Sequence, residues 1–286
     1  MFHKILCPVD LGEFTSVQLA LACGFAKTQD ARVSLLHVVS MPVGLYDMDT
    51  LAALQKEWNA QARDRLKSVC ENGKTEGLIT HGLIVDEILA TAESGGYDLI
   101  FMPTHGRRGL QRFFLGSTFH GVLTRSPLPV MVLPPLLLEQ RPDHFAKPSR
   151  ILCAVDLQHG SAHLVSVTEK LAAEFQSSFD VLHCIHVQRD VFPMLAPESL
   201  AHTARRIRDR MLSQHPEIRS AREIQVENGA AYEQIVQCAE KNRIDLVVLG
   251  FSRTSPWRIR TTLYRAISAL RVPALCIPLG TQEEAP

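Results

Sequence analysis

The 286-residue chain has no excess of charge of either sign, because 30 Lys and Arg residues balance 30 Asp and Glu residues. Domains that bind nucleic acids usually carry a basic excess, since much of their affinity comes from neutralised phosphates. We therefore expect no nucleic-acid partner. The chain also lacks an uninterrupted apolar run of the roughly 18 residues that a membrane span requires. The nearest run, residues 127–138, is broken by prolines, so we predict no membrane span.

The sequence also lacks the marks of secretion and of a metal site. The first ten residues, MFHKILCPVD, contain no long apolar segment behind a charged one, so we expect no secretory signal. The seven cysteines have no CxxC spacing, and most lie in apolar runs where a thiol acts as a small hydrophobe. These features predict a cytoplasmic protein. The spacing of the twelve histidines fixes no set of three metal ligands, so we predict no metal site.

An internal repeat is the most informative feature that the sequence does contain. Residues 5–10, ILCPVD, recur 146 positions later at residues 151–156 as ILCAVD. Residues 97–102 and 129–134 also recur, with offsets of 147 and 144. Collinear matches with a near-constant offset indicate a duplicated domain, and the period is too long for a solenoid.

Within each copy, short runs rich in Val, Ile and Leu alternate with longer segments of helical spacing. In the first copy the predicted strands are residues 4–9, 33–39, 77–80, 99–103 and 130–133. The predicted helices are residues 15–27, a stretch within 47–71, 86–93 and 117–124. Apolar runs without polar alternation are typical of parallel strands covered on both faces. The pattern predicts an α/β protein with two tandem doubly wound sheets, each five-stranded and mainly parallel.

The composition between the copies indicates a linker. We place the first domain at residues 1–135, a proline-rich linker at 136–148 and the second domain at 149–280. The leucines at 136–138 are expected to pack on a domain. Each copy ends in an apolar strand beside prolines, and an edge strand with unpaired backbone groups favours pairing with an equivalent edge. Such pairing would join the two copies into an internal pseudo-dimer, or two chains into a homodimer.

Ligands of doubly wound sheets bind beyond the carboxyl ends of the strands, where the strand order reverses. The loop after the first strand offers Asp10, which can accept hydrogen bonds from a ribose or a base and can equally cap a turn. The residues after the fourth strand are Thr104, His105, Gly106 and, nine positions later, Gly116, Ser117 and Thr118. Glycines let backbone amides approach phosphates, and a helix N-terminus favours an anion. An ordinary glycine turn before a Ser-capped helix accounts for the same residues, and both interpretations stay open.

Taken together, residues 5–10 (ILCPVD), residues 35–38 (LLHV) and the pattern THG-x9-GS at residues 104–117 resemble the universal stress protein family in its tandem form. The resemblance covers essentially the whole chain. It implies the adenine nucleotide alpha hydrolase-like fold of that family. It also implies that the first domain binds ATP or AMP, with or without Mg²⁺, as a sensor or switch toward a protein partner that the sequence does not identify.

The resemblance assigns roles to individual residues. Asp10 and Val38 would contact the adenine, and Pro8 would shape that pocket. The residues near the ribose and phosphates would be Thr104, His105, Gly106, Gly116, Ser117 and Thr118. The family pattern Gly-x2-Gly-x9-Gly-Ser/Thr has Pro103 at its first position here. Proline has no amide hydrogen, so Pro103 cannot donate to a ligand.

The second copy departs further from the family pattern. Gly250 keeps the first glycine, Arg253 replaces the second, and Leu263-Tyr264 stand nine residues later where Gly-Ser is expected. We therefore expect a degenerate partner domain. Two alternatives are a scaffold protein that binds no nucleotide, and a second domain that holds an apolar or acyl ligand near Phe251. Because common catalytic motifs are missing, we expect no enzyme, with at most slow incidental ATP hydrolysis.

Overall fold

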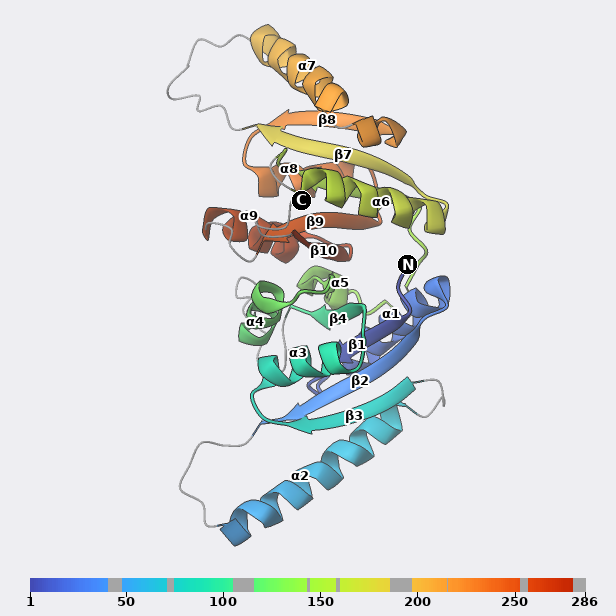
Figure 1. Cartoon of the computed structure of the whole chain (residues 1–286), viewed down its shortest axis with the longest axis vertical. Coiled ribbons are helices and arrows are strands. Elements are labelled where there is room, and N and C mark those ends of the chain that lie inside the picture. Colours follow the sequence, from blue (N-terminus) through green and yellow to red (C-terminus); the bar gives the residue numbers. More distant parts are fainter. Residues whose placement is uncertain are drawn as a thin grey trace. The chain divides into compact units, whose positions relative to one another are not determined.

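The computed structural model describes residues 1–40, 48–70, 75–104, 116–142, 145–157, 160–185, 197–214, 216–252 and 257–279. It divides into two compact units, one covering Phe2–Ala146 and the other beginning at Lys147. Each unit is an α/β sandwich around a parallel sheet (Figure 1). In the part of the chain that is described, no helix is long and apolar enough to cross a membrane.

The first unit contains one parallel sheet with the order β3-β2-β1-β4-β5. Its strands are β1 (Lys4–Pro8), β2 (Arg32–Val39), β3 (Thr75–His81), β4 (Leu99–Pro103) and β5 (Val130–Leu133). Its helices are α1 (Thr15–Gln29), α2 (Met48–Val69), α3 (Ile84–Ser94), α4 (Ser117–Arg125) and the short α5 (Pro135–Glu139). The predicted strands and helices of this copy are all present, with ends that move by a few residues.

The second unit repeats this topology with the order β8-β7-β6-β9-β10, again parallel. Its strands are β6 (Arg150–Val155), β7 (Ser178–Ile185), β8 (Glu223–Asn228), β9 (Leu246–Ser252) and β10 (Ala274–Leu279). Its helices are α6 (Ser161–Phe175), α7 (Pro197–Gln214), α8 (Ala231–Lys241), α9 (Trp257–Ala269) and the 3₁₀ turn η1 (Pro216–Ser220). The predicted fold class, two doubly wound parallel sheets, is confirmed.

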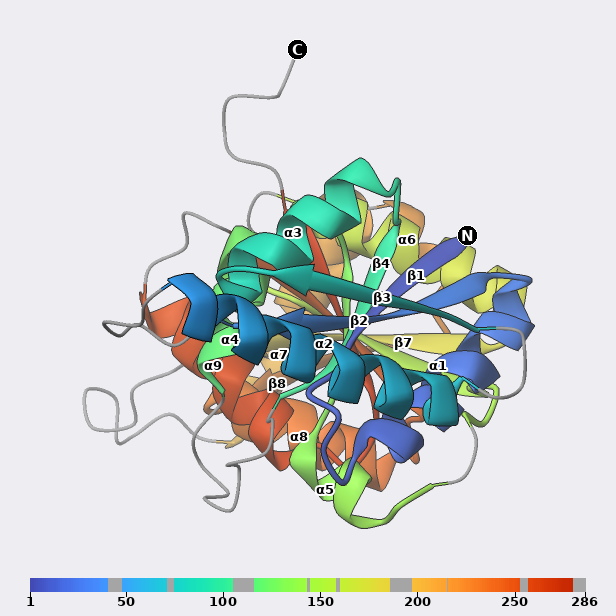
Figure 2. The same cartoon turned by 90° about the horizontal axis from the view of Figure 1, so that it is seen from below.

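The apolar runs form the centre of each sheet because helices cover both faces. In the first unit, α2 and α3 lie on opposite faces of the sheet (Figure 2). The middle strands β1 and β4 are almost fully buried, whereas the edge strand β3 is mostly half-exposed. Continuous burial without alternation is what a parallel strand between two helical layers requires.

The duplication extends to side-chain contacts at the amino ends of the strands. Asp98 accepts hydrogen bonds from the backbone N–H groups of His3 (2.7 Å) and Lys4 (3.0 Å). Asp245, at the matching position, accepts from the N–H groups of Ser149 (2.7 Å) and Arg150 (3.0 Å). The repeat therefore preserves the way in which the first and fourth strands of each unit are tied together.

The segment between the repeats is fastened to α1. Phe145 is buried and meets Phe25 edge-on, with ring centroids 5.2 Å apart. Gly24 permits this approach, because a Cβ added there would lie 2.6 Å from the backbone nitrogen of Phe145. Of the leucines predicted to pack, Leu137 and Leu138 are buried on α5.

We expect Gly24→Ala to destabilise the protein by about 1–3 kcal/mol, because the new methyl group meets backbone that has no room to move aside. Gly121→Ala is the matched control. It also lies in a helix, but its Cβ would meet the side chain of Val85, which can shift. Because alanine favours helix by about 1 kcal/mol over glycine, the control should stay close to wild type. Urea unfolding compares the two, and equal losses would contradict the account of Gly24.

Four of the seven cysteines are buried hydrophobes, as predicted for thiols in apolar runs. Cys7, Cys153, Cys238 and Cys276 are buried, and Cys23, Cys70 and Cys184 are half-exposed. Burial raises the pKa of Cys153 to about 12 and raises the pKa values of Cys7 and Cys276 as well. A thiol is unreactive until it ionises. These side chains therefore serve packing rather than chemistry.

At pH 8, below these raised pKa values, the buried thiols stay protonated in the native chain. We expect iodoacetamide to leave Cys7, Cys153 and Cys276 unmodified before unfolding and to alkylate them in urea. Peptide mass spectrometry reads each site, and the half-exposed Cys23 is the internal control. If the three thiols were alkylated in the native chain as fast as the thiol of Cys23, the claim that they are buried would be contradicted.

Candidate functional site

In the first unit β1 and β4 separate where the strand order reverses, and we call the space between their carboxyl ends the crevice. The register of β1 with β4 includes Ile5–Leu99 and Leu6–Ile100, whereas β1 stays paired with β2 as far as Pro8–Leu36. β1 and β4 therefore separate toward their carboxyl ends. This separation is the feature at which doubly wound sheets bind ligands.

Asp10 lies half-buried at the β1 side of the crevice. Its Oδ1 accepts a hydrogen bond from the backbone N–H of Gly12 at 2.8 Å. The ring Nδ1 of His37 lies 2.9 Å from the Val9 carbonyl oxygen, and the Val9 N–H donates to Leu36 at 2.8 Å. The turn role predicted for Asp10 is thus present for one oxygen, and these bonds fix where the carboxylate stands.

Pro8 and Val38 are buried at the ends of the two strands beside Asp10, with Val38 9% exposed. The structure therefore brings Pro8, Asp10 and Val38 to the same edge of the sheet. Pro8 and Val38 are apolar, and both lie on the β2 side of the crevice. They provide a surface that suits a flat apolar group.

Gln18 is a residue of this site that the sequence reasoning missed. It lies on α1 beneath the crevice and is 2% exposed. Its Nε2 donates to the carbonyl oxygens of Pro8 (2.9 Å) and Phe101 (3.1 Å), which belong to the two separating strands. Buried amides keep hydrogen-bond partners, but the sequence does not single Gln18 out, because Thr15 and Gln29 are also buried polar residues of α1.

The loop after β4 is closed at its base. The Gly116 N–H donates to the Thr104 carbonyl at 2.8 Å, and the Thr104 N–H donates to Leu133 at 3.3 Å. Thr104 is buried, 1% exposed. The predicted residues His105 and Gly106 lie outside the described residues. The two ends of the predicted phosphate loop are nevertheless tied together above the crevice.

This closure sets the start of α4 beside the crevice. Gly116 is the N-cap, with φ −60° and ψ 146°, a conformation open to any residue. The value of this glycine is thus its lack of a side chain rather than its backbone freedom. Ser117 is exposed and Thr118 half-exposed, and no acidic side chain lies in the first turn. The first amides of α4, with their partial positive charge, are suited to an anion.

Pro103 lies at the last position of β4, paired with Leu133. Ile100 and Thr104 donate their N–H groups toward β5, to Pro129 and Leu133. Since donors alternate sides along a strand, the nitrogen of Pro103 faces the crevice. The departure from the family pattern therefore removes one donor from the site and leaves the sheet intact.

The second copy keeps the frame of this site and changes its contents. The ring Nδ1 of His183 lies 3.0 Å from the Val155 carbonyl, as His37 does with Val9. The Ser161 hydroxyl lies 3.3 Å from Asp156 Oδ1 and is a donor to it. At the position of Gln18, 146 residues later, stands Leu164, which is buried.

Leu279, the half-exposed last residue of β10, packs over the matching edge of the second unit. A Cβ built on Gly250 would lie 2.7 Å from its Cδ1, and one built on Gly160 would lie 3.0 Å from its Cδ2. Gly160 precedes α6 and Gly250 lies near the end of β9, so the leucine lies across the carboxyl ends of β6 and β9, which stay paired as far as Ala154–Leu249. This packing accounts for Gly250 without a phosphate.

The last helix of the second unit also corrects the prediction made for Leu263. Buried positions 263, 266, 267 and 270 repeat 119, 122, 123 and 126 at the constant offset of 144. Leu263 therefore matches the core residue Phe119, not Gly116. Counting nine residues from Arg253 failed because the connection and the helix differ in length: α9 has 13 residues and α4 has 9. Arg253 itself lies outside the described residues.

The longer helix has a chemical consequence. The equivalents of Ser117 and Thr118 are Thr261 and Thr262, which lie beyond the first turn of α9. Only the first four amides of a helix lack partners within it. The amides of Ser117 and Thr118 lie in the first turn of α4, where the helix supplies no acceptor. The amides of Thr261 and Thr262 lie further along α9, where the helix supplies its own acceptors.

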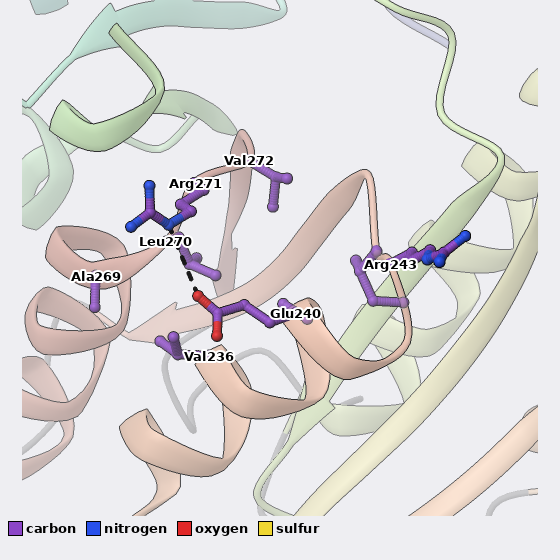
Figure 3. A pocket seen from close by; sticks show the side chains of 9 residues that line it. Val236, Glu240, Arg243, Ala269, Leu270, Arg271 and Val272 are labelled. Carbon is purple, nitrogen blue, oxygen red and sulfur yellow. Dashed lines mark ion pairs between the residues drawn. The ribbon is translucent and has the colours of Figure 1, made fainter. Parts of the chain in front are cut away.

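A separate pocket of about 210 Å³ lies in the second unit, between α8 and α9 (Figure 3). Its lining residues are Val236, Ala239, Glu240, Arg243, Ile244, Ala269, Leu270, Arg271 and Val272. Figure 3 shows Arg271 turned toward Glu240, and Arg271 Nε lies 3.8 Å from Glu240 Oε1. Ile244 and Val272 precede β9 and β10, so the pocket lies at the amino ends of the strands, away from the crevice. Phe251, named for an apolar ligand, is instead buried and does not line it.

Within the described ranges, no group of three or more His, Cys, Asp or Glu side chains is placed to hold a metal ion.

Two tandem doubly wound domains, each with a five-stranded parallel sheet, define the class as α/β proteins with a duplicated domain. Comparison with known proteins assigns the family. The model of the universal stress protein family matches residues 1–134 and again residues 148–268. The chain therefore belongs to the universal stress protein family and carries two of its domains in tandem.

Individual relatives agree with this assignment. Universal stress protein MJ0577 of Methanocaldococcus jannaschii is 28% identical over 154 residues, which covers 46% of this chain and 95% of that protein. Universal stress protein MJ0531 of the same organism is 31% identical over 140 residues, 46% of this chain and 82% of that protein. A universal stress protein from Archaeoglobus fulgidus matches 98% of this chain and 97% of its own, with a TM-score of 0.68 at 19% identity, which supports the fold.

The packing of Leu279 predicts a coupled pair of substitutions. Gly250→Ala should destabilise the protein by about 1 kcal/mol, because its methyl group would displace the end of the leucine side chain and, unlike Gly121→Ala, it gains no helix propensity in return. In the double variant with Leu279→Ala the collision is absent, so the combined loss should fall short of the sum by at least about 0.5 kcal/mol. Urea unfolding of the four proteins measures the coupling. Additive losses would mean that Leu279 does not pack over Gly250.

Proposed function

We propose that the first domain binds an adenine nucleotide, ATP or AMP, and that the second domain is a partner without an equivalent site. The observation that carries this proposal is the hydrogen bond from Gly116 to Thr104, which sets the free amides of α4 above the crevice. Pro8, Val38 and Asp10 line its other side. A site with an apolar wall, one carboxylate and a helix N-terminus matches a base, a ribose and a phosphate group in that order.

The residues of the first domain fit such a ligand in chemical terms. The carboxylate of Asp10 retains accepting capacity for a ribose hydroxyl or a base amino group. The glycine before α4 leaves room for phosphate oxygens, and the amides of α4 offer donors. Where ATP is the ligand, Mg²⁺ would accompany the phosphates as part of the ligand.

A nucleotide in this position would act as a signal. Binding to the folded state alone stabilises it by an amount that rises with the logarithm of the ligand concentration above Kd. Contacts between the phosphates and the start of α4 would also bias the position of that helix, and so the surface offered to a protein partner. We propose a binding protein rather than an enzyme, in which any hydrolysis of ATP is slow and incidental.

Calorimetric titration of the full chain, freed of bound ligand by unfolding and refolding, tests this proposal. We expect one ATP site per chain. Gly116→Leu should abolish it, because the new side chain fills the phosphate space, while Thr261→Leu in α9 is the control that leaves binding unchanged. Two equal sites, or no binding by the wild type, would contradict the proposal.

Pro103→Gly offers a gain of function. Glycine restores an N–H group that faces the crevice, and one added hydrogen bond corresponds to about a fivefold gain in affinity. The same titration measures it. Unchanged ATP affinity in this variant would show that the nitrogen at position 103 does not face the ligand, whereas a non-binding scaffold would give no heat in either protein.

A further inference from the structure

The first domain exposes an apolar pair at the edge of its crevice. Leu83 is 74% exposed and Ile84 is 39% exposed, and they stand out as large exposed hydrophobic side chains within the described part of the chain. They form the turn between β3 and α3, where Leu83 is the N-cap. Isolated exposed leucines are ordinary, so their meaning depends on what lies around them.

This turn lies at the same edge of the sheet as the proposed nucleotide site. The Gly82 N–H donates to the Val39 carbonyl at 3.3 Å, which joins the turn to the end of β2 beside Val38. His81 pairs with Val39, so Leu83 lies two residues beyond the carboxyl end of β3, at the same edge of the sheet as Val38. Its exposed side chain can extend toward a base that rests on Val38.

The turn is also close to the helix that would hold the phosphates. Gly121 of α4 faces Val85 of α3, since a Cβ added at Gly121 would lie 2.7 Å from the Val85 side chain. The two helices therefore pack tightly just behind Leu83. The turn that carries Leu83 is thus joined to the end of β2 through Gly82 and leads into the helix that packs on α4 through Val85.

The second domain has the same turn without the apolar pair. Gly229 has φ +145° where Gly82 has φ +147°, and its N–H donates to Ile185 at 2.9 Å. The residues that follow are Ala230 and Ala231. The backbone of the turn therefore forms without Leu or Ile. The larger side chains occur in the domain with the open crevice and are missing from the one where Leu279 packs over the matching edge.

We infer that Leu83 is a specificity-determining residue of the nucleotide site, which closes over the flat face of the base and favours a purine over the smaller pyrimidine. This inference rests on the proposed function and adds a residue to it. An apolar side chain that is exposed in the free protein gains by being covered with a base. The same contact gives no advantage to a ligand that has phosphates alone.

The test compares Leu83→Ala with the wild type in titrations of the full chain with ATP, AMP, CTP and inorganic tripolyphosphate. Loss of most of a leucine contact corresponds to about a tenfold loss of affinity. We expect that loss for ATP and AMP, a smaller one for CTP, and unchanged binding of tripolyphosphate. Because Leu83 is largely exposed, the melting temperature of the ligand-free protein should not change.

Ala230→Leu, the reciprocal change in the second domain, is the matched control and should leave every affinity unaltered. Unchanged ATP affinity in Leu83→Ala, together with lost binding in Gly116→Leu, would overturn the role of Leu83 and leave the nucleotide site standing. Equal weakening of ATP and tripolyphosphate would also overturn it, since it would show a general distortion. Absence of ATP binding by the wild type would overturn both.

Discussion

The divergence of the first and fourth strands at the carboxyl edge is the constraint on which the functional part of the first domain depends. Two parallel strands that separate leave carbonyl and amide groups without a neighbour, and such groups need partners when they are shielded from water. Something must enter the gap. In the first domain Gln18 bridges it from below, through the carbonyls of Pro8 and Phe101, and leaves the upper part open.

The second domain does not have this divergence, because β6 and β9 stay paired as far as Ala154–Leu249. Leu164 replaces the bridging glutamine, and Leu279 packs over Gly160 and Gly250. The extended start of α9 engages the amides that would otherwise face the crevice. These three changes agree with one another, because backbone amides at an edge covered by apolar side chains need acceptors within the protein. The two copies of the repeat therefore differ at this edge, which carries polar groups in the first domain and apolar side chains in the second.

Much of this fold could be predicted from the sequence. The strands are nearly continuous apolar runs, which parallel packing requires, and the matched pairs Asp10/Asp156 and Asp98/Asp245 reveal the repeat. Asp10 and Gly116 are recognisable because a carboxylate after a strand and a glycine before a helix are typical of ligand-binding loops in doubly wound sheets. Gln18 escapes prediction because α1 buries three polar residues, Thr15, Gln18 and Gln29, and nothing in the sequence distinguishes the one that bridges the strands. Leu279 escapes it because the last residue of an apolar strand looks like any other core position.

The alignment of α9 with α4 could not be predicted by counting residues from Arg253. The length of a loop can differ between the two copies, whereas the spacing of the buried residues on the helix is the same in both. The buried positions of α9 align it with α4 correctly. That alignment supports the central claim, that the ligand crevice is open in the first domain and closed in the second.

A crystal structure of the full chain grown with ATP and Mg²⁺ tests this claim most directly. The account predicts density for one nucleotide, between Asp10 and Gly116, and Leu279 in contact with Gly250. Nucleotide density beside Gly250, or an empty first crevice at saturating ATP, would contradict it.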